Sequence, residues 1–355
     1  MRPVRTAFLL AASLFARAAL ATPPRIEVQR VIETGSMPKG VSISPDGNRL
    51  YVSNYGQLDH DNISVVDAHT MAQIARINVP GIVVETAVSP DGLTLYASNF
   101  RRHSVQFIDL ATRAVTREVP AGRHPKIVVL SRDGRRLFAA NGGSRDVTES
   151  DTVSGAVVRT LAAEENPRGM AMTNAGRLYV ANSTSDSIEV YEGPTMATHT
   201  RLPHVCRIPR HLNLSPDDSR LYISCLGAAT LSVLDTATNR VVQRVAVASG
   251  PRGNDVSPDG HWVATADYNA CTVTLVDTTD WSTRAVAVRT MDRASGVVFS
   301  RDASGVRLFV TGWYDDHLFE IGVVGAGSGT PYHPTRREIE RTLQAREDHT
   351  AHPLE

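Results

Sequence analysis

The sequence predicts an all-β protein, a seven-bladed β-propeller whose blades are four-stranded sheets. Three observations predict this fold: one hairpin motif recurs seven times, its copies are evenly spaced, and almost no helical periodicity is present. The first copy, SPDGNRLYVSN, covers residues 44–54, and the first residues of successive copies lie 45, 42, 42, 42, 42 and 43 positions apart. A period of this length with several short strands is typical of a propeller blade, so seven periods predict seven blades.

Each period begins with a β-hairpin. In the first period, Pro45 fixes the φ angle of a tight turn, Asp46 accepts local hydrogen bonds, and Gly47 takes the left-handed conformation. The flanking residues 40–43 and 50–52 are apolar, β-branched or aromatic, which suits a buried pleated sheet. The later turns begin at Ser89, Ser131, Thr173, Ser215, Ser257 and Ser300.

A third strand follows each hairpin, such as residues 63–66 or 231–234, and ends at a turn that contains aspartate. We expect these aspartates to cap the turns through their side chains; they are Asp67, Asp109, Asp151, Asp235 and Asp277. In the third period, residues 147–150 (VTES) are polar where the other periods are apolar, which predicts a weaker outer strand there.

The N-terminal strand is expected to close the ring. Residues 25–35 (RIEVQRVIETG) resemble residues 240–250 (RVVQRVAVASG), which occupy the place of an outermost strand. The last period stops after residues 318–321 and lacks that strand. Closure by the N-terminal strand would remove exposed sheet edges, which otherwise pair with other chains.

The two ends of the chain read differently from the repeats. Residues 1–21 have a basic start, an apolar run at 7–15 and a small-x-small site at 19–21, as in a secretory signal cleaved after Ala21. That apolar run is too short to span a bilayer. We therefore expect a periplasmic or secreted protein with a propeller at 25–324 and a flexible linker and tail at 325–355.

Composition limits the functions that remain open. The 355 residues are 42% hydrophobic and carry a formal net charge of zero, which argues against a generally basic, sequence-blind nucleic-acid binder. Any polyanion site must therefore be local. Three cysteines do not make a disulfide scaffold. Cys206 and Cys225 belong to one blade, so they either form a disulfide in an oxidising compartment or remain free thiols. Cys271 is expected to remain a thiol if the other two pair.

The recurring SPDG…LYVSN pattern resembles the YVTN-repeat family of seven-bladed propellers, from about residue 25 to residue 324. The resemblance implies the fold and says little about function. Members include secreted binding proteins, some of which bind single-stranded DNA, and cell-surface proteins. The architecture is also similar to lactonase-type propellers and to the d-type haem domain of a nitrite reductase, and a fold alone does not choose among these functions.

Positions that differ between periods are the candidates for a site. Five periods carry proline followed by a base shortly before the turn, whereas Val84 and Ser295 take that place in the other two. This position enters the innermost strand, so the bases should surround one mouth of the central channel and attract an anion. The alternative is that each long side chain points into solvent and covers apolar rim. The five bases are Lys39, Lys126, Arg168, Arg210 and Arg252, and Lys39 and Lys126 are the only lysines in the chain.

The residue after the repeat's asparagine gives a second asymmetry. Four periods that become contiguous on ring closure have an aromatic residue there, and the other three have Gly142, Ser183 and Leu226. Beside the bases, such rings could stack planar groups of a ligand whose phosphate or carboxylate the cations hold. Alternatively, the rings pack between neighbouring blades. The aromatic residues are Tyr55, Phe100, Tyr268 and Trp313.

Signatures of metal sites and enzymes are weak. Histidine and aspartate gather in corresponding loops of adjacent blades, at His60, His103, His317, Asp59, Asp61, Asp315 and Asp316, without HxH or HExxH spacing. No GxSxG elbow is present. We interpret the histidines expected near the channel mouth as rim residues, although each could serve as a general base or haem ligand; they are His124, His204 and His211.

These observations favour an exported, non-enzymatic binding or scaffold propeller. We expect it to recognise an anionic ligand or a protein partner on the channel-mouth face, with single-stranded nucleic acid among the ligands to test. We assign it no cofactor, metal, catalytic residue or transmembrane segment and expect a monomer. The alternatives are a lactonase-like or lyase-like enzyme, a d-type haem-binding propeller and a structural surface protein.

Overall fold

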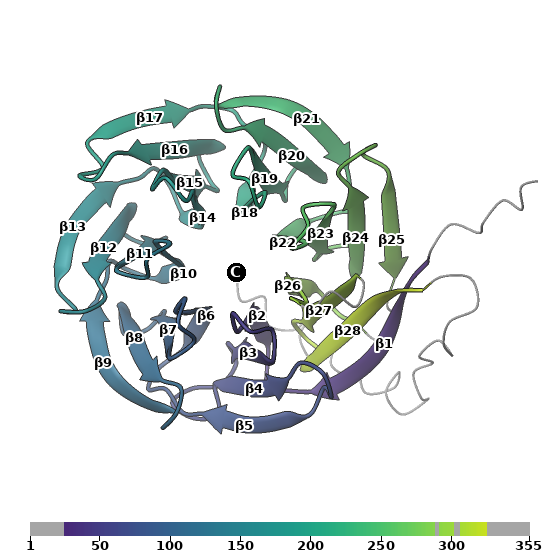
Figure 1. The fold of residues 1–355 in the computed structure, drawn as a ribbon, viewed down its shortest axis with the longest axis horizontal. Helices are drawn as coiled ribbons and strands as arrows, with labels where there is room; N and C mark the ends of the chain where they lie inside the picture. Colours follow the sequence, from purple (N-terminus) through teal and green to yellow (C-terminus); the bar gives the residue numbers. More distant parts are fainter. Residues whose placement is uncertain (1–24, 288–290, 302–305, 325–355) are drawn as a thin grey trace, which may run out of the picture.

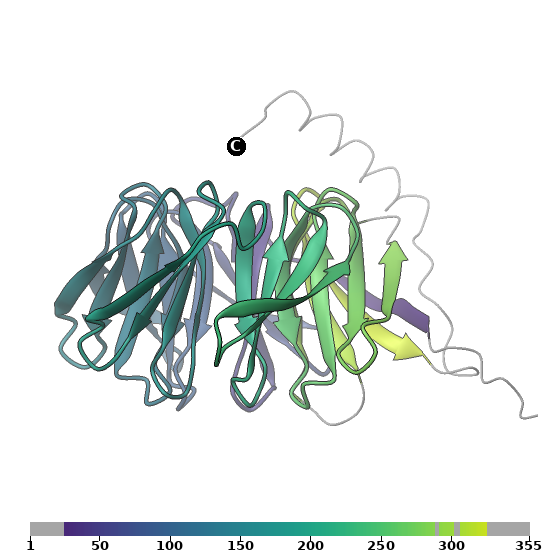
Figure 2. The same cartoon turned by 90° about the horizontal axis from the view of Figure 1, so that it is seen from above.

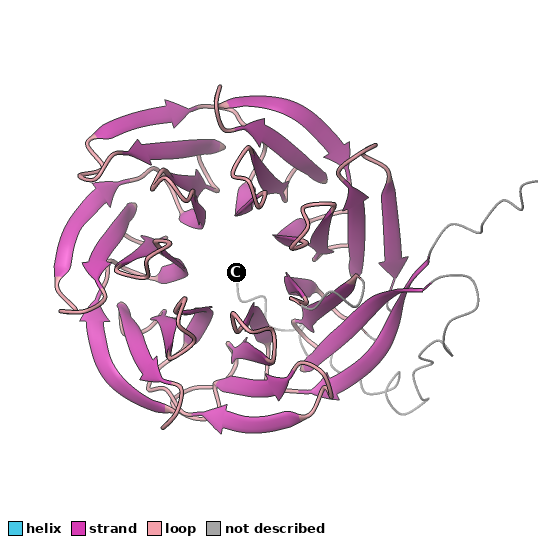
Figure 3. Cartoon of the chain, in the orientation of Figure 1, coloured by secondary structure: helices cyan, strands magenta, loops and turns pink. Residues whose placement is uncertain are grey.

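A computed structural model describes residues 25–287, 291–301 and 306–324. Twenty-eight strands form seven four-stranded antiparallel sheets arranged as blades around a central axis (Figure 1). Seen from the side, the blades form a thick disc (Figure 2), and no helix occurs in the described ranges (Figure 3). The predicted fold class is confirmed. The predicted signal at 1–21 and the linker and tail at 325–355 lie outside the described residues.

We number the blades by the order of their inner strands. The inner strands are β2 (Pro38–Ile43), β6 (Val83–Val88), β10 (Pro125–Leu130), β14 (Pro167–Met172), β18 (Pro209–Leu214), β22 (Pro251–Val256) and β26 (Ala294–Phe299). The second strands are β3 (Arg49–Asn54), β7 (Thr94–Asn99), β11 (Arg136–Asn141), β15 (Leu178–Asn182), β19 (Arg220–Cys225), β23 (Trp262–Asp267) and β27 (Arg307–Gly312).

The outer half of each blade consists of a third and a fourth strand. The third strands are β4 (Ile63–Asp67), β8 (Ser104–Asp109), β12 (Asp146–Asp151), β16 (Ser187–Glu192), β20 (Thr230–Asp235), β24 (Thr272–Asp277) and β28 (His317–Val324). The fourth strands are β5 (Gln73–Ile77), β9 (Ala114–Pro120), β13 (Val157–Ala162), β17 (Thr198–Leu202), β21 (Arg240–Ala246), β25 (Thr283–Ala287) and, in blade 7, β1 (Arg25–Glu33).

The N-terminal strand closes the ring, as predicted. Strand β1 pairs antiparallel with β28, with Arg25 opposite Val324 and Glu33 opposite His317 (Figure 1). The backbone N–H of Thr34 then donates to the carbonyl of Asp316 at 2.8 Å. Blade 7 therefore contains both ends of the described chain, and its outer edge is formed by the first strand rather than the last.

The repeated turns are built as their sequence predicts. The N–H of Gly47 donates to the carbonyl of Ser44 at 2.9 Å, and the N–H of Arg49 donates to the Ser44 hydroxyl at 2.9 Å. Gly47 has a φ of 75°, the region that favours glycine. At the other turn, Asp67 accepts the N–H of Thr70 at 2.8 Å, and this bond lowers the pKa of Asp67. The same capping bond recurs at Asp109, Asp151 and Asp235, and Asp277 accepts the N–H of Thr279, two residues on.

The asparagine that ends the second strand ties the blade to its loops. Asn54 Nδ2 donates to the carbonyl of Asp61 at 3.0 Å and to the Ser64 hydroxyl at 3.0 Å. In blade 5, Cys225 takes this position and forms a disulfide with Cys206, in the loop that precedes β18. The cysteine pair that the sequence left open is thus joined, and a covalent bond replaces the asparagine bridge.

Removing this disulfide is expected to destabilise the protein. The crosslink spans 19 residues, and the loss of loop-closure entropy from the unfolded chain predicts about 2–4 kcal/mol. Replacing both Cys206 and Cys225 with serine should lower the free energy of unfolding in urea by that amount. Unchanged urea midpoints in both the double variant and the reduced wild-type protein would contradict the expectation.

Blade 6 has Asp267 in place of the asparagine. Its carboxylate is buried and accepts hydrogen bonds from Thr265 at 2.8 Å, Thr272 at 3.2 Å and Thr274 at 2.6 Å. Burial raises the pKa of Asp267 to about 7, although the three hydroxyl donors oppose the shift. Near neutral pH, this carboxyl therefore titrates inside the blade.

The protein should lose stability as the pH rises through this range. Between the unfolded pKa of about 3.9 and the folded value of about 7, only the folded chain holds the Asp267 proton, so stability falls with rising pH. Asp267→Asn restores the residue of the repeat and removes the titrating carboxyl. It should abolish a fall of about 1–3 kcal/mol in the free energy of unfolding between pH 5 and pH 8. Urea unfolding of both proteins at these pH values measures it, and parallel pH profiles would refute the assignment.

Candidate anion site at the channel mouth

The five bases predicted to form a ring line one cavity on the propeller axis. Each is the second residue of an inner strand, namely of β2, β10, β14, β18 and β22. The cavity has a volume of about 350 Å³, and its lining includes Lys39, Lys126, Arg168, Arg210 and Arg252 together. The structure therefore brings all five positions to one place, contributed by five different blades.

Local backbone geometry explains why these side chains reach the channel. In all five blades the residue before the proline is left-handed, with φ values of 51° to 72°. This conformation turns the chain sharply into the inner strand, and proline fits the first strand position because it has no N–H to donate. The left-handed residues are Met37, His124, Asn166, Ile208 and Gly250.

A repeated backbone bond places the aromatic residues at the same mouth. In every blade, the residue after the second strand donates its N–H to the carbonyl of a residue just before the inner strand. For the four aromatic residues these bonds are 2.8–3.1 Å long. The pairs are Tyr55 with Met37, Phe100 with Ile82, Tyr268 with Gly250 and Trp313 with Arg293. The aromatic ring of each residue is thus held beside the bases.

Two of the bases rest on a shared group of rings. Lys39 Nζ lies 4.6 Å from the ring centroid of Tyr55 and 5.3 Å from that of Trp313. The Arg252 guanidinium lies 4.4 Å from Trp313 and 4.6 Å from Tyr268. Such cation–π contacts fix a cation without neutralising it. Among the described residues, no carboxylate forms an ion pair with Lys39 or Arg252.

A third base, Lys126 of blade 3, rests on an aromatic ring of the neighbouring blade 2. Lys126 Nζ lies 4.4 Å from the centroid of Phe100, and Phe100 stacks on His124 at 4.3 Å. His103 follows at 5.2 Å from His124, so two histidines extend the aromatic row along the rim. Lys126 is only 6% exposed. Its stem is therefore packed, and its ammonium is reached through the cavity.

The four rings also pack against one another across blade boundaries. Tyr55 lies 6.1 Å from Phe100 and 5.5 Å from Trp313, and Tyr268 lies 6.3 Å from Trp313. Trp313 is 5% exposed, whereas the other three are partly exposed. The rings therefore support the bases and join blades 6, 7, 1 and 2, and stacking on a ligand stays a prediction.

The charges of the other four bases act on Lys39. Burial, and then the charges of Arg252, Lys126, Arg168 and Arg210, lower the pKa of Lys39 well below its ordinary value. These arginines and lysines repel one another because they share a cavity with low-dielectric walls. The same arrangement focuses a positive field on whatever enters the mouth.

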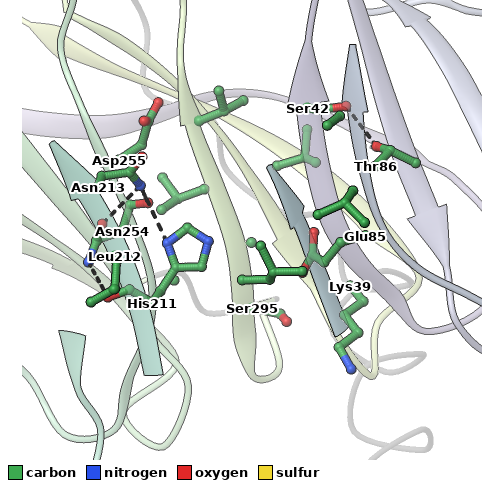
Figure 4. Close-up of a pocket in the computed structure, with 18 of the residues that line it drawn as sticks. Lys39, Ser42, Glu85, Thr86, His211, Leu212, Asn213, Asn254, Asp255 and Ser295 are labelled. Atoms are coloured by element: carbon green, nitrogen blue, oxygen red, sulfur yellow. Dashed lines mark hydrogen bonds between the residues drawn. The ribbon is translucent and has the colours of Figure 1, made fainter. Parts of the chain in front are cut away.

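A carboxyl and an imidazole lie directly beneath the bases. Figure 4 shows Glu85 and Lys39 on one side of the cavity and His211 on the other. Burial raises the pKa of Glu85 to about 7 against the opposing charge of Lys39. Burial also lowers the pKa of His211 to about 4, so this imidazole is neutral at physiological pH.

Sequence reasoning missed Glu85 as a site residue. It is the third residue of β6, and the same position is glycine in four other blades: Gly40, Gly169, Gly253 and Gly296. A Cβ at Gly253 would lie 2.7 Å from the carbonyl oxygen of Ser295, so the inner strands approach too closely for most side chains. Aligning this position across the periods would have singled out Glu85.

Three of the predicted loop aspartates accept hydrogen bonds from the backbone of neighbouring loops. Asp59 accepts the N–H of Gly81 at 2.6 Å, Asp315 accepts that of Asp292 at 2.7 Å, and Asp316 accepts that of Met37 at 2.8 Å. His60 is exposed. Over the described ranges, no three histidine, cysteine or acidic side chains are arranged to hold a metal, and no helix is long and apolar enough to cross a membrane.

Comparisons with known proteins agree with the fold. A family model described as a YNCE-like beta-propeller matches residues 170–323. Antigen Lp49 of Leptospira interrogans serogroup Icterohaemorrhagiae serovar copenhageni (strain Fiocruz L1-130) is 29% identical over 106 residues, which cover 26% of this chain and 23% of that protein. The match thus spans less than a quarter of the relative's length.

A solved structure extends the likeness over most of the chain. Hydrazine synthase of Kuenenia stuttgartiensis superposes with a TM-score of 0.72 and 19% sequence identity, covering 82% of this chain and 97% of that one. At this level of identity the likeness shows a shared fold alone.

Proposed function

We propose that this chain, a YVTN-like seven-bladed β-propeller, is an exported binding protein that recognises an anionic ligand with the bases at one channel mouth. One observation carries the proposal: five bases from five separate blades line a single cavity. Like charges gathered in this way raise the energy of the ligand-free protein. An anion in the cavity would relieve that repulsion, so the arrangement favours binding over mere stability.

The way the bases are held supports the same function. Lys39 and Arg252 rest on aromatic rings, which fix their positions and leave their charges available to a ligand. Fixing the side chains beforehand reduces the entropy that binding must otherwise remove. The disulfide between Cys206 and Cys225 fits export, because such bonds persist in oxidising compartments and are rare in the cytosol.

A flexible polyanion tests the proposal. We would titrate the protein into a fluorescein-labelled single-stranded oligodeoxynucleotide over a salt series and measure anisotropy. The test variant changes Lys126, Arg168 and Arg210 to serine, and the matched control changes the exposed Arg132, Arg135 and Arg240 to serine.

We expect binding that weakens with salt, with a slope of log affinity against log salt that is shallower by about 2 in the test variant. The control variant should keep the wild-type slope. No binding at low salt would reject the polyanion as a ligand. Equal losses in the two variants would show that the channel mouth is not the site.

The aromatic support makes its own prediction. Trp313→Leu removes one of the two ring contacts of Lys39 and one of the two of Arg252, so anion affinity should fall about tenfold, because both cations lose part of their support. In the wild-type protein, a ligand that stacked on Trp313 would quench tryptophan fluorescence. If the ring only supports the cations, ligand binding should change the fluorescence intensity little. Unchanged affinity in this variant would show that the bases hold their places without the tryptophan.

A second candidate function rests on Glu85 and His211, which share the cavity with the bases (Figure 4). A carboxyl whose pKa is about 7 suits general acid–base work at neutral pH, as a lactonase-like or lyase-like enzyme needs. Turnover of an anionic lactone that Glu85→Gln abolishes would favour this function. Binding that survives in the same variant without turnover would favour the binding protein.

A further inference from the structure

We infer that the ligand is a small oxyanion with at least three negative charges, which enters the cavity and is held by bases of several blades at once. This inference rests on the proposed function and narrows it. It identifies the ligand as compact and multiply charged, either a polyphosphate or a polycarboxylate. A polymer that lies across the face of the propeller is a different kind of ligand, and the tests below distinguish the two.

The accessibility of the lysines favours a ligand that enters the cavity. Lys39 and Lys126 are 7% and 6% exposed, so a molecule resting on the outer face would not reach them. A volume of about 350 Å³ lies at the lower end of the range for small-molecule pockets. A compact anion fits such a space, whereas a nucleic-acid strand would touch only the three partly exposed arginines, Arg168, Arg210 and Arg252.

The charge of the lining sets the charge of the ligand. The layer at the channel mouth contains the five bases of the ring and one acidic residue beneath them, Glu85. Arg301 and Asp255 also line the cavity, but they lie toward its other end, after β26 and near the end of β22. With Glu85 ionised and His211 neutral, the formal charge of this layer is +4. An anion with three or four negative charges balances this field, whereas a single carboxylate satisfies at most one or two neighbouring bases.

The lumen beneath the bases explains why the ligand is compact. At the third position of the inner strands, directly below the bases, four blades have glycine. The other three blades have Glu85, Ile127 and His211 at this position, so only these place side chains in this layer of the channel. The Glu85 carboxyl and the neutral His211 face each other across the cavity (Figure 4). A chain of negative charges that passed deeper would meet Glu85 and be repelled. The ligand is therefore confined to the layer of the bases.

A ladder of anions tests the inference by isothermal titration calorimetry of the full mature chain. The ligands are orthophosphate, pyrophosphate and tripolyphosphate, with acetate and citrate as the corresponding carboxylates, in low-salt buffer without divalent cations. We expect affinity to rise about tenfold for each added negative charge. Pyrophosphate and citrate each carry about three negative charges near neutral pH, so whichever of these two binds more tightly identifies the class of ligand.

Two double variants locate the binding. Arg168→Gln with Arg210→Gln should weaken tripolyphosphate or citrate binding by about 100-fold, as expected for the loss of two charge-assisted contacts. Arg132→Gln with Arg135→Gln, in the exposed turn at the far end of β10, should leave it unchanged. Thermal unfolding of each variant verifies that it is folded.

Each outcome separates the inference from the function on which it rests. If orthophosphate or acetate binds as tightly as the higher charges, or if only the oligonucleotide binds at the ring, the ligand is not a small multivalent anion. The proposed function would survive that result. If no anion binds at low salt, both the inference and the proposed function fail.

Discussion

Replacing Arg168 and Arg210 with glutamine is expected to lower anion affinity by about 100-fold and, in the absence of ligand, to make the protein more stable. Both arginines line the cavity, and the charge of each contributes to lowering the pKa of Lys39. Removing two like charges from one low-dielectric site relieves repulsion of about 1–3 kcal/mol. If the two arginines stabilised the fold, their replacement would instead lower the free energy of unfolding.

Urea unfolding without ligand measures this effect. It is done at low salt and at about 0.5 M salt, where the short Debye length strongly screens the repulsion between charges. The gain in stability should shrink at high salt, because salt already weakens the repulsion. The variant with Arg132→Gln and Arg135→Gln is the control and should show little change. A destabilised channel variant would mean that the two arginines act as structural residues.

Replacing Glu149 with alanine is expected to lower the free energy of unfolding by about 3–5 kcal/mol. Glu149 is 1% exposed on β12. Its carboxylate accepts a hydrogen bond from Arg136 Nε of β11 at 2.8 Å and forms an ion pair with Arg159 Nε of β13 at 3.0 Å. Its removal leaves two guanidinium groups beside each other with no buried carboxylate between them. Loss of one partner from a buried ionic cluster is costly for this reason.

Two further variants test the cause of that loss. Glu149→Gln keeps an acceptor oxygen and should lose less than the alanine variant. Glu165→Ala removes an exposed pair with Arg145, whose side chains are 48% and 63% exposed, and should cost less than about 1 kcal/mol. Equal losses for Glu149→Ala and Glu165→Ala, measured by urea unfolding, would refute the buried cluster.

The blade architecture could be predicted because it depends on a repeated local pattern. The turn residues, the strand spacing and the likeness of the first strand to an outer strand are all local, and together they predict the closed ring. The position of the bases followed because each comes directly after a proline that begins an inner strand. The ligand-binding role of these residues stays a prediction.

Contacts between strands could not be predicted from the same pattern. The polar segment at 147–150 indicated a weak outer strand, yet Glu149 is matched by arginines on both neighbouring strands, and β13 pairs along β12. Glu85 reaches the cavity from a strand whose register shifts between Val83 and Thr86, which the sequence does not mark. The pairing of Cys206 with Cys225 depends on a loop path that residue spacing leaves open.

The two lysines allow the central claim to be tested most directly. Because Lys39 and Lys126 are the only lysines in the chain, labelling lysine with ¹³C at Cε gives NMR signals from the channel mouth alone. We expect both signals to shift on addition of tripolyphosphate or citrate, with one shared affinity. The Lys39 signal should titrate well below the ordinary lysine pKa in the free protein and at higher pH with the anion bound. An anion that binds by calorimetry and leaves both lysine signals unchanged would place its site elsewhere and contradict the account.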